Sequence, residues 1–174
     1  MKIELIEQRL GKPIKRNVEV LGIDTASRTG WCLLKTTKKE LTIDYGVVHI
    51  NTKDTYFKYN EIIKVFFEII KPEHNVVVED TFFRFNPAMF RLISRIGAIA
   101  YTLAHLKGCN VQYLYATTAR KNLGLKGNGK KQEVQAEFKK KIELEIEDND
   151  VVDAIILAFN GALGSTTLFK EDNT

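Results

Sequence analysis

Four carboxylates adjoin the most apolar stretches of the chain, and they are Asp24, Glu79, Asp150 and Asp153. Asp24 ends the apolar run VEVLGI, and Glu79 follows three consecutive valines. A buried carboxylate must find hydrogen bonds or a cation, because leaving it unpaired costs several kcal/mol. A hard divalent cation would satisfy several such acids at once, and carboxylate oxygens are the ligands that Mg²⁺ and Mn²⁺ prefer. The four residues therefore predict a divalent metal site.

Asp150 and Asp153 are three residues apart at the start of a predicted helix that continues with the apolar residues AIILAF. This spacing places both side chains on one helix face about one turn apart, and a helix N-terminus favours negative charge. An alternative is that Asp148, Asn149 and Asp150 only cap the helix and that Glu79 pairs with an arginine. Four acids beside buried elements are too many for ion pairs alone, so their combination favours the metal site.

The strands that must position these acids are predicted from runs of β-branched and aliphatic residues. They cover residues 18–23, 31–36, 41–50, 75–78 and 111–115. Short connections join the first three, which favours an antiparallel meander, and the valine run is typical of a strand buried on both faces. Neighbouring strands lie about 4.8 Å apart. If the strand ending at Asp24 lies beside the strand ending before Glu79, the two carboxylates meet.

Apolar residues at helical spacing predict the helices. These are a short helix ending at Gly11, a short helix starting near Thr117, and longer helices at residues 55–70, 86–107, 132–144 and from 151 onward. The helix at 86–107 is rich in small residues, which allow close packing on the sheet or on a second copy of the helix. The element order predicts an α/β fold with a mixed five-stranded sheet, three antiparallel strands plus two parallel strands, flanked by helices.

The length of 174 residues fits one domain with its own core. We expect that domain at residues 18–164, an N-terminal appendage at 1–17 and a C-terminal tail at 165–174. The net charge of +4 fits a polyanionic partner without establishing one. Residues 1–17 carry acids and no long apolar core, so we expect neither a signal peptide nor a membrane anchor, and we expect the cytoplasm as compartment.

The positions of the cysteines and histidines do not predict a metal site. Cys32 and Cys109 are expected to be reduced thiols in the core. His49, His74 and His105 are scattered along the sequence, whereas a zinc site needs a cluster. The predicted chemistry therefore rests on the carboxylates.

Three segments together resemble the RuvC-type Holliday junction resolvases of the ribonuclease H-like (retroviral integrase) superfamily. GIDTASRTG is similar to the opening strand motif of that family, VVVEDTFF to its second acidic strand, and DNDVVDAIILA to its terminal helix. The likeness covers roughly residues 18–163, and it is the order and spacing of the three motifs that make it specific. It implies a ribonuclease H-like fold and a homodimer that cuts four-way DNA junctions with symmetric nicks.

The resemblance also implies the chemistry of the site. Asp24, Glu79, Asp150 and Asp153 would be the catalytic metal ligands, with two Mg²⁺ ions per active site and Mn²⁺ as a possible substitute. In such a site one ion activates water and the other stabilises the leaving oxygen, the two lying about 3.5 to 4 Å apart.

Several further residues match or adjoin the regions where the family contacts DNA. Lys130 or Lys131, in the segment GNGKKQEV, would touch the scissile phosphate, and Lys126 lies in the same loop; a solvated loop is the alternative. Phe82 and Phe83 match a position where an aromatic side chain enters the junction, with a core role as the alternative. The remaining phosphate-binding candidates are Arg84, Arg91 and Arg95.

The sequence also departs from the family pattern. Thr25, Ala26 and Ser27 stand where a glycine usually follows the first aspartate, so the cleavage preference is open, and Asp80 adds an acid beside Glu79. The leading residues outside the motifs suggest a phage, viral or otherwise divergent member.

Three other functions remain as alternatives. The first is a related nuclease that acts on RNA, RNA–DNA hybrid or branched DNA. The second is a non-catalytic junction-binding protein, which the retained acids disfavour. The third is a sugar kinase or actin-like ATPase, a class that needs two such domains and a glycine-rich nucleotide motif, for which 174 residues are too few.

Overall fold

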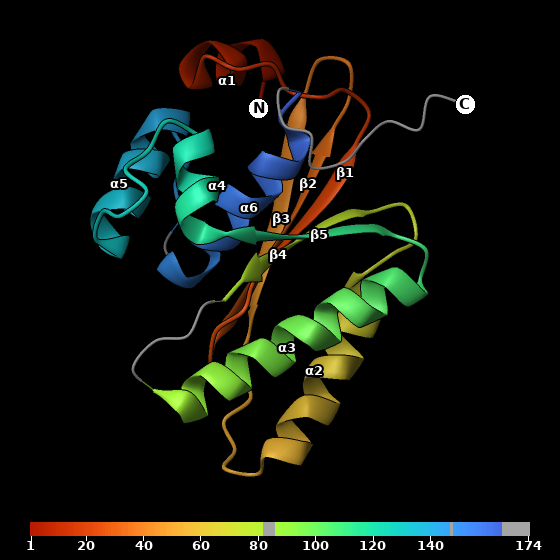
Figure 1. Ribbon diagram of the computed structural model, residues 1–174. Coiled ribbons are helices and arrows are strands. Elements are labelled where there is room, and N and C mark those ends of the chain that lie inside the picture. The colour runs from red at the N-terminus through yellow and green to blue at the C-terminus, as the bar shows by residue number, and fades with distance from the viewer. Residues whose placement is uncertain (82–85, 147, 165–174) are drawn as a thin grey trace.

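The computed structural model describes residues 1–81, 86–146 and 148–164, and it contains one mixed five-stranded sheet (Figure 1). The strands are β1 (Glu19–Asp24), β2 (Thr29–Thr36), β3 (Leu41–Val48), β4 (Asn75–Asp80) and β5 (Asn110–Tyr115), in the spatial order β3-β2-β1-β4-β5. Strands β1, β2 and β3 pair antiparallel, whereas β4 pairs parallel with both β1 and β5. The predicted fold class is therefore confirmed.

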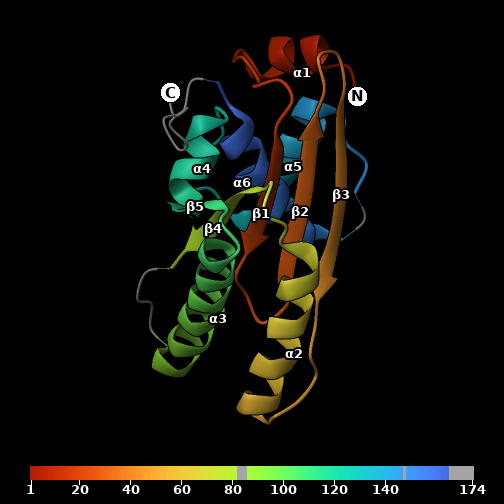
Figure 2. The same ribbon diagram turned by 90° about the vertical axis from the view of Figure 1, so that its right-hand side faces the viewer.

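Helices cover both faces of the sheet (Figures 1 and 2). They are α1 (Ile3–Leu10), α2 (Thr55–Ile69), α3 (Pro87–Leu106), α4 (Ala116–Asn122), α5 (Lys131–Ile142), the 3-10 turn η1 (Asn149–Val151) and α6 (Val152–Ala162). Leu21 and Ile23 of β1 pack in a core with α2 and α3, while Val20 packs in a second core with α6, α5, α4 and α1. None of the described helices is long and apolar enough to cross a bilayer.

The ends of the helices follow from their sequence. The Asn86 side chain accepts hydrogen bonds from the backbone N–H groups of Ala88 and Met89, both at 3.1 Å, and Pro87 occupies the first turn of α3. Gly11 ends α1 in the left-handed conformation, at φ 66°. The small residues of α3 lie against the sheet, since Gly97, Ala100 and Ala104 are buried there. Packing on the sheet, the first of the two predicted alternatives, is what the structure shows.

A glycine brings α6 into direct contact with β1. A Cβ atom at Gly22 would lie 2.2 Å from the carbonyl oxygen of Ala154 and 2.6 Å from the backbone nitrogen of Ala158. Any larger residue would push the helix away from the strand. Asp24 lies two residues after Gly22, and Asp153 directly precedes Ala154, so this close approach sets the distance between the two acids.

Residues 1–17 attach to the far ends of α5 and α6. Arg9 donates a hydrogen bond to the carbonyl oxygen of Ile142 at 3.2 Å and forms an ion pair with Glu143 at 2.5 Å. The backbone N–H of Lys15 donates to the carbonyl oxygen of Ala162 at 2.8 Å. Ile3, Ile6 and Leu10 of α1 are buried in the core on the α6 side of the sheet.

Candidate active site

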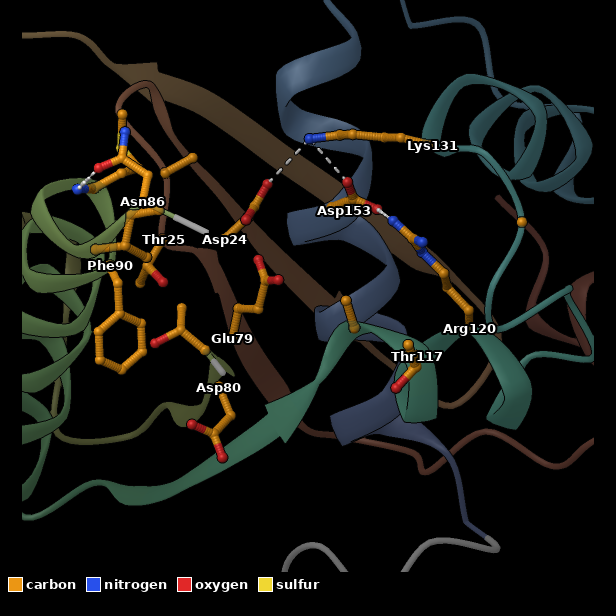
Figure 3. A pocket seen from close by; sticks show the side chains of 16 residues that line it. Asp24, Thr25, Glu79, Asp80, Asn86, Phe90, Thr117, Arg120, Lys131 and Asp153 are labelled. Atoms are coloured by element: carbon orange, nitrogen blue, oxygen red, sulfur yellow. Dashed lines mark hydrogen bonds and ion pairs between the residues drawn. The ribbon is translucent and has the colours of Figure 1, made fainter. Parts of the chain in front are cut away.

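Two parallel strands and one helix deliver three of the four predicted acids to one pocket of about 400 Å³, which Asp80 also lines (Figure 3). The register of β1 and β4 pairs Ile23 with Val78, so the next residues of both strands, Asp24 and Glu79, emerge at the same edge of the sheet. Asp153 comes from the first turn of α6. The predicted meeting of the acidic strand ends is therefore observed, and Asp153 joins them.

The other walls of the pocket come from helices on both sides of the sheet. Met89, Phe90 and Ile93 of α3 form an apolar side of the pocket, next to the polar Asn86 at the start of this helix. Arg120 of α4 and Lys131 of α5 supply positive charge on the remaining side. The pocket thus places basic groups next to carboxylates, an arrangement suited to a phosphodiester with its metal ions.

Asp153 is held by three donors from two helices. Its Oδ1 accepts from Arg120 Nη2 at 3.2 Å, and its Oδ2 accepts from Gln135 Nε2 at 3.2 Å. Lys131 Nζ lies 3.0 Å from the same Oδ2 and 3.7 Å from Oδ2 of Asp24 (Figure 3). This carboxylate therefore has a fixed orientation before any ligand arrives.

Burial dominates the electrostatics of the pocket. It raises the pKa of Asp24, and it raises the pKa of Glu79 to about 10 together with the hydrogen bond to Asp24 and the negative charge of that residue. Burial alone would lower the pKa of Lys131, but the charges of Asp24 and Asp153 outweigh it and the pKa is raised. A group of acids this costly to ionise fits a divalent cation, because the cation can replace the proton that Asp24 and Glu79 share.

Asp150 has a different setting from the other three acids. It lies in η1, its carboxylate is partly exposed, and its Oδ2 forms an ion pair with Arg28 Nε at 2.6 Å. Arg28 Nη2 also reaches Asp148 at 3.1 Å, and Asp148 accepts a hydrogen bond from the backbone N–H of Asp150 at 2.9 Å. Asp148 thus caps the 3-10 turn η1, whereas among the described residues no side-chain cap hydrogen bond is found at the start of α6, where the alternative expected one. Asp150 stands beside the pocket rather than in its wall.

The structure separates the predicted DNA-binding residues. Lys131 reaches the acids, whereas Lys130 is 86% exposed and lies 3.6 Å from Glu133. Lys126 is exposed on the loop before α5. Arg91 and Arg95 are exposed on α3 outside the pocket wall. Phe82, Phe83 and Arg84 lie outside the described residues.

Three residues were not identified from the sequence as part of the site: Thr25 and Arg120, which line the pocket, and Gln135, which donates a hydrogen bond to Asp153. Gln135 follows Lys131 by four residues, so helical spacing places both on one face and could have indicated it. Nothing in the spacing of ATTARKN marks Arg120. Thr25 is buried, and within the described part of the chain neither its Oγ1 nor Nε of Arg120 has a hydrogen-bond partner. Both polar atoms belong to pocket-lining residues.

A second acidic group lies at the opposite end of β1. Ligand atoms of Glu19, Glu73 and His74 all lie within 4.8 Å of one another. However, His74 Nδ1 accepts a hydrogen bond from the backbone N–H of Lys71 at 3.2 Å, so in the neutral ring Nε2 carries the proton and faces Glu19 at 3.5 Å. Lys35 lies 2.8 Å from the same Glu19 oxygen. In this group Glu19 is therefore paired with Lys35 and faces the protonated nitrogen of His74, and the imidazole has no free nitrogen for a metal.

Comparison with known proteins identifies the family of this chain. The family model for the crossover junction endodeoxyribonuclease RuvC matches residues 20–160. The RuvC protein of Helicobacter pylori strain P12 is 29% identical over 154 residues, covering 83% of this chain and 96% of that protein. RuvC of Helicobacter acinonychis strain Sheeba is 29% identical over 150 residues, covering 81% and 94%.

Solved structures give the same fold. The structure of Thermus thermophilus RuvC superimposes with a TM-score of 0.68 at 16% identity, covering 84% of this chain and 98% of that chain. The same protein in complex with a Holliday junction substrate gives a TM-score of 0.65 at 16% identity, covering 82% and 91%. These matches confirm the family and enzyme class predicted from the three motifs. The chain belongs to the RuvC family of crossover junction endodeoxyribonucleases, which are metal-dependent nucleases.

Proposed function

We propose that this protein resolves four-way DNA junctions by paired symmetric nicks, and that the pocket between β1, β4 and α6 is its active site. The observation that carries the proposal is the meeting of Asp24, Glu79 and Asp153 in one pocket, two of them almost fully buried. Such acids are costly unless a cation is bound. Phosphodiester hydrolysis needs no side-chain nucleophile when metal-bound water attacks.

Asp24, Glu79 and Asp153 are the proposed metal ligands, with Asp150 as a fourth once its carboxylate leaves Arg28. An all-oxygen donor set suits two Mg²⁺ ions, with Mn²⁺ as substitute. Bound there, the ions would supply an activated water and charge stabilisation at the leaving oxygen. Glu79, whose raised pKa keeps it protonated at neutral pH, gives up its proton when it becomes a ligand.

The basic residues around the pocket are the proposed DNA contacts. Arg120 and Lys131 line the pocket and would bind the phosphate at the scissile bond. The exposed side chains of Lys126, Lys130, Arg91 and Arg95 would bind the DNA backbone further out. An aromatic role for Phe82 or Phe83 in the junction, and a phosphate contact for Arg84, stay predictions from the sequence.

A homodimer is proposed as the working form, because symmetric nicks on a two-fold junction need two active sites. Helix α2 exposes Tyr56, Phe57 and Phe67, and a second copy of the chain would cover this apolar surface. We further propose that residues 18–164 form the nuclease domain, with 1–17 as an addition and 165–174 as a tail. The site of action would be the cytoplasm at the nucleoid, or the host cytoplasm for a phage or viral protein.

One substrate comparison tests the proposal. With Mg²⁺ or Mn²⁺, the protein should cut a synthetic four-way junction and leave linear duplex and RNA–DNA hybrid intact. Asp24→Asn should abolish cleavage while junction binding is retained, and Asp44→Asn, which changes an exposed acid of β3, should cleave normally. Equal cleavage of duplex or hybrid would instead support the related nuclease. Junction binding without cleavage in either metal would support the non-catalytic alternative.

A further inference from the structure

The ammonium group of Lys131 lies among the acids where a cation would be expected (Figure 3). Its Nζ is 3.0 Å from Asp153 Oδ2 and 3.7 Å from Asp24 Oδ2. The two carboxylate side chains are only 9% and 6% exposed, whereas the lysine side chain is 48% exposed. Lys131 therefore enters the pocket from the solvent side and ends between two buried acids.

Among the described residues, no second basic side chain forms an ion pair with Asp24. Asp153 also accepts hydrogen bonds from Arg120 and Gln135. For Asp24, the ion pair with Lys131 is the only one found in residues 1–81, 86–146 and 148–164. The Arg120 side chain is 11% exposed, and the acid it pairs with in the described part of the chain is Asp153. Lys131 is thus the basic group that links both acids and also has room to withdraw.

We propose that Lys131 is the resident counter-ion of the acidic pocket, and that it leaves the position between Asp24 and Asp153 when a divalent cation binds there. The inference rests on the proposed function, which makes this pocket the metal site. Two cations a few ångströms apart repel each other strongly, even at the effective dielectric constant of a protein. The flexible four-carbon stem of lysine allows the ammonium to turn toward solvent, where an arriving phosphate is a new partner.

Metal affinity provides the first test, with Lys130 as matched control. Ca²⁺ binding is measured by titration calorimetry, without DNA, for the unchanged protein, Lys131→Gln and Lys130→Gln. We expect Lys131→Gln to bind Ca²⁺ at least about tenfold more tightly, because a competing charge is gone. Lys130→Gln should stay within about twofold, since its ammonium is exposed and faces Glu133. Equal or weaker binding by Lys131→Gln would overturn the inference while leaving the nuclease assignment intact.

Chemical labelling of the unchanged protein provides the second test and needs no variant to fold. Reductive methylation followed by mass spectrometry compares Lys131 with Lys130, with and without Ca²⁺. Labelling of Lys131 should rise several-fold when Ca²⁺ is added, because its ammonium leaves the position between the two buried carboxylates and becomes accessible to the reagent. Labelling of Lys130 should stay constant. A constant Lys131 signal at saturating Ca²⁺ would overturn the inference, and a protein that binds no divalent ion in either test would overturn the metal site as well.

Discussion

Acidic residues lie at both ends of the β1–β4 strand pair, but their burial and their partners differ between the two ends. At one end, Glu19 is partly exposed and faces Lys35 and His74, so its charge has a local partner. At the other end, Asp24 is buried and Glu79 is half-buried, the two share a hydrogen bond, and Asp24 faces one lysine ammonium. The first arrangement pairs Glu19 with nearby basic groups, whereas the second holds Asp24 and Glu79 so close that ionising both is costly without a further cation. A functional acidic cluster is recognised by this close, desolvated contact between carboxyl groups, since the number of acids alone does not distinguish the two ends.

The largest expected effect comes from removing one acid at each end. Glu79→Gln should lower the rate of junction cleavage by about a thousandfold or more, because it removes a proposed metal ligand. Glu19→Gln should change the rate by less than about twofold. Single-turnover cleavage of a labelled four-way junction at saturating Mg²⁺ measures both. Equal losses would abolish the distinction between the two ends.

Gly22 lies between the two ends of β1, and its missing side chain allows α6 to pack directly against the strand near Asp24. Gly22→Ala should lower the free energy of unfolding by about 3 kcal/mol or more, because the new Cβ would meet backbone atoms of α6 that cannot turn aside. Gly108→Ala is the control: no atom lies within 4 Å of its Cβ position, and only its φ of 81° opposes alanine, at a cost of about 1 to 2 kcal/mol. Urea denaturation compares them, and a similar loss in both would contradict close packing at Gly22.

The two ends should respond to pH with opposite sign when no metal is bound. The folded protein keeps a proton on Glu79 up to a pKa of about 10, against an ordinary value of 4.5, so this end loses stability as pH rises through that window. Burial lowers the pKa of His74 from its ordinary 6.5, so that end loses stability as pH falls below 6.5. The slope from Glu79 is at most about 1.4 kcal/mol per pH unit.

Urea denaturation in a chelator, repeated across pH, separates these two contributions. Glu79→Gln should flatten the alkaline side of the stability curve, and His74→Gln should flatten the acid side. If Glu79→Gln left the alkaline slope unchanged, the carboxyl would not be protonated in the folded state.

The smallest expected effect concerns the orientation of Asp153. Gln135→Leu removes one hydrogen bond to that carboxylate and should slow junction cleavage by about tenfold, with the folded state retained. Gln132→Leu, which changes an exposed residue of the same helix, should leave the rate unchanged. Parallel rate measurements decide, and a normal rate for Gln135→Leu would show that Arg120 and Lys131 suffice to hold Asp153.

Much of this architecture could be predicted from local patterns. The valine run of β4 and the apolar run of β1 marked central strands, and their parallel pairing brought Asp24 and Glu79 together as expected. Arg120 escaped prediction because α4 meets Asp153 only through tertiary packing, which no local spacing records. The pairing of Asp150 with Arg28 was also invisible, since it joins residues far apart in the sequence. Local patterns were thus enough to locate the acids, whereas the basic residues that pair with them are set by long-range packing.

The anchoring of α5 affects how quickly a divalent cation could replace the Lys131 ammonium in the pocket. Arg9 fastens the last turn of this helix, and Gln135 ties its first turns to α6 through Asp153. With its backbone held at both ends, movement of the Lys131 ammonium requires only torsions along its own stem, which interconvert in picoseconds to nanoseconds. At the proposed metal site, loading of Mg²⁺ would then be limited by the slow loss of its hydration water, and no rearrangement of the chain would set the pace.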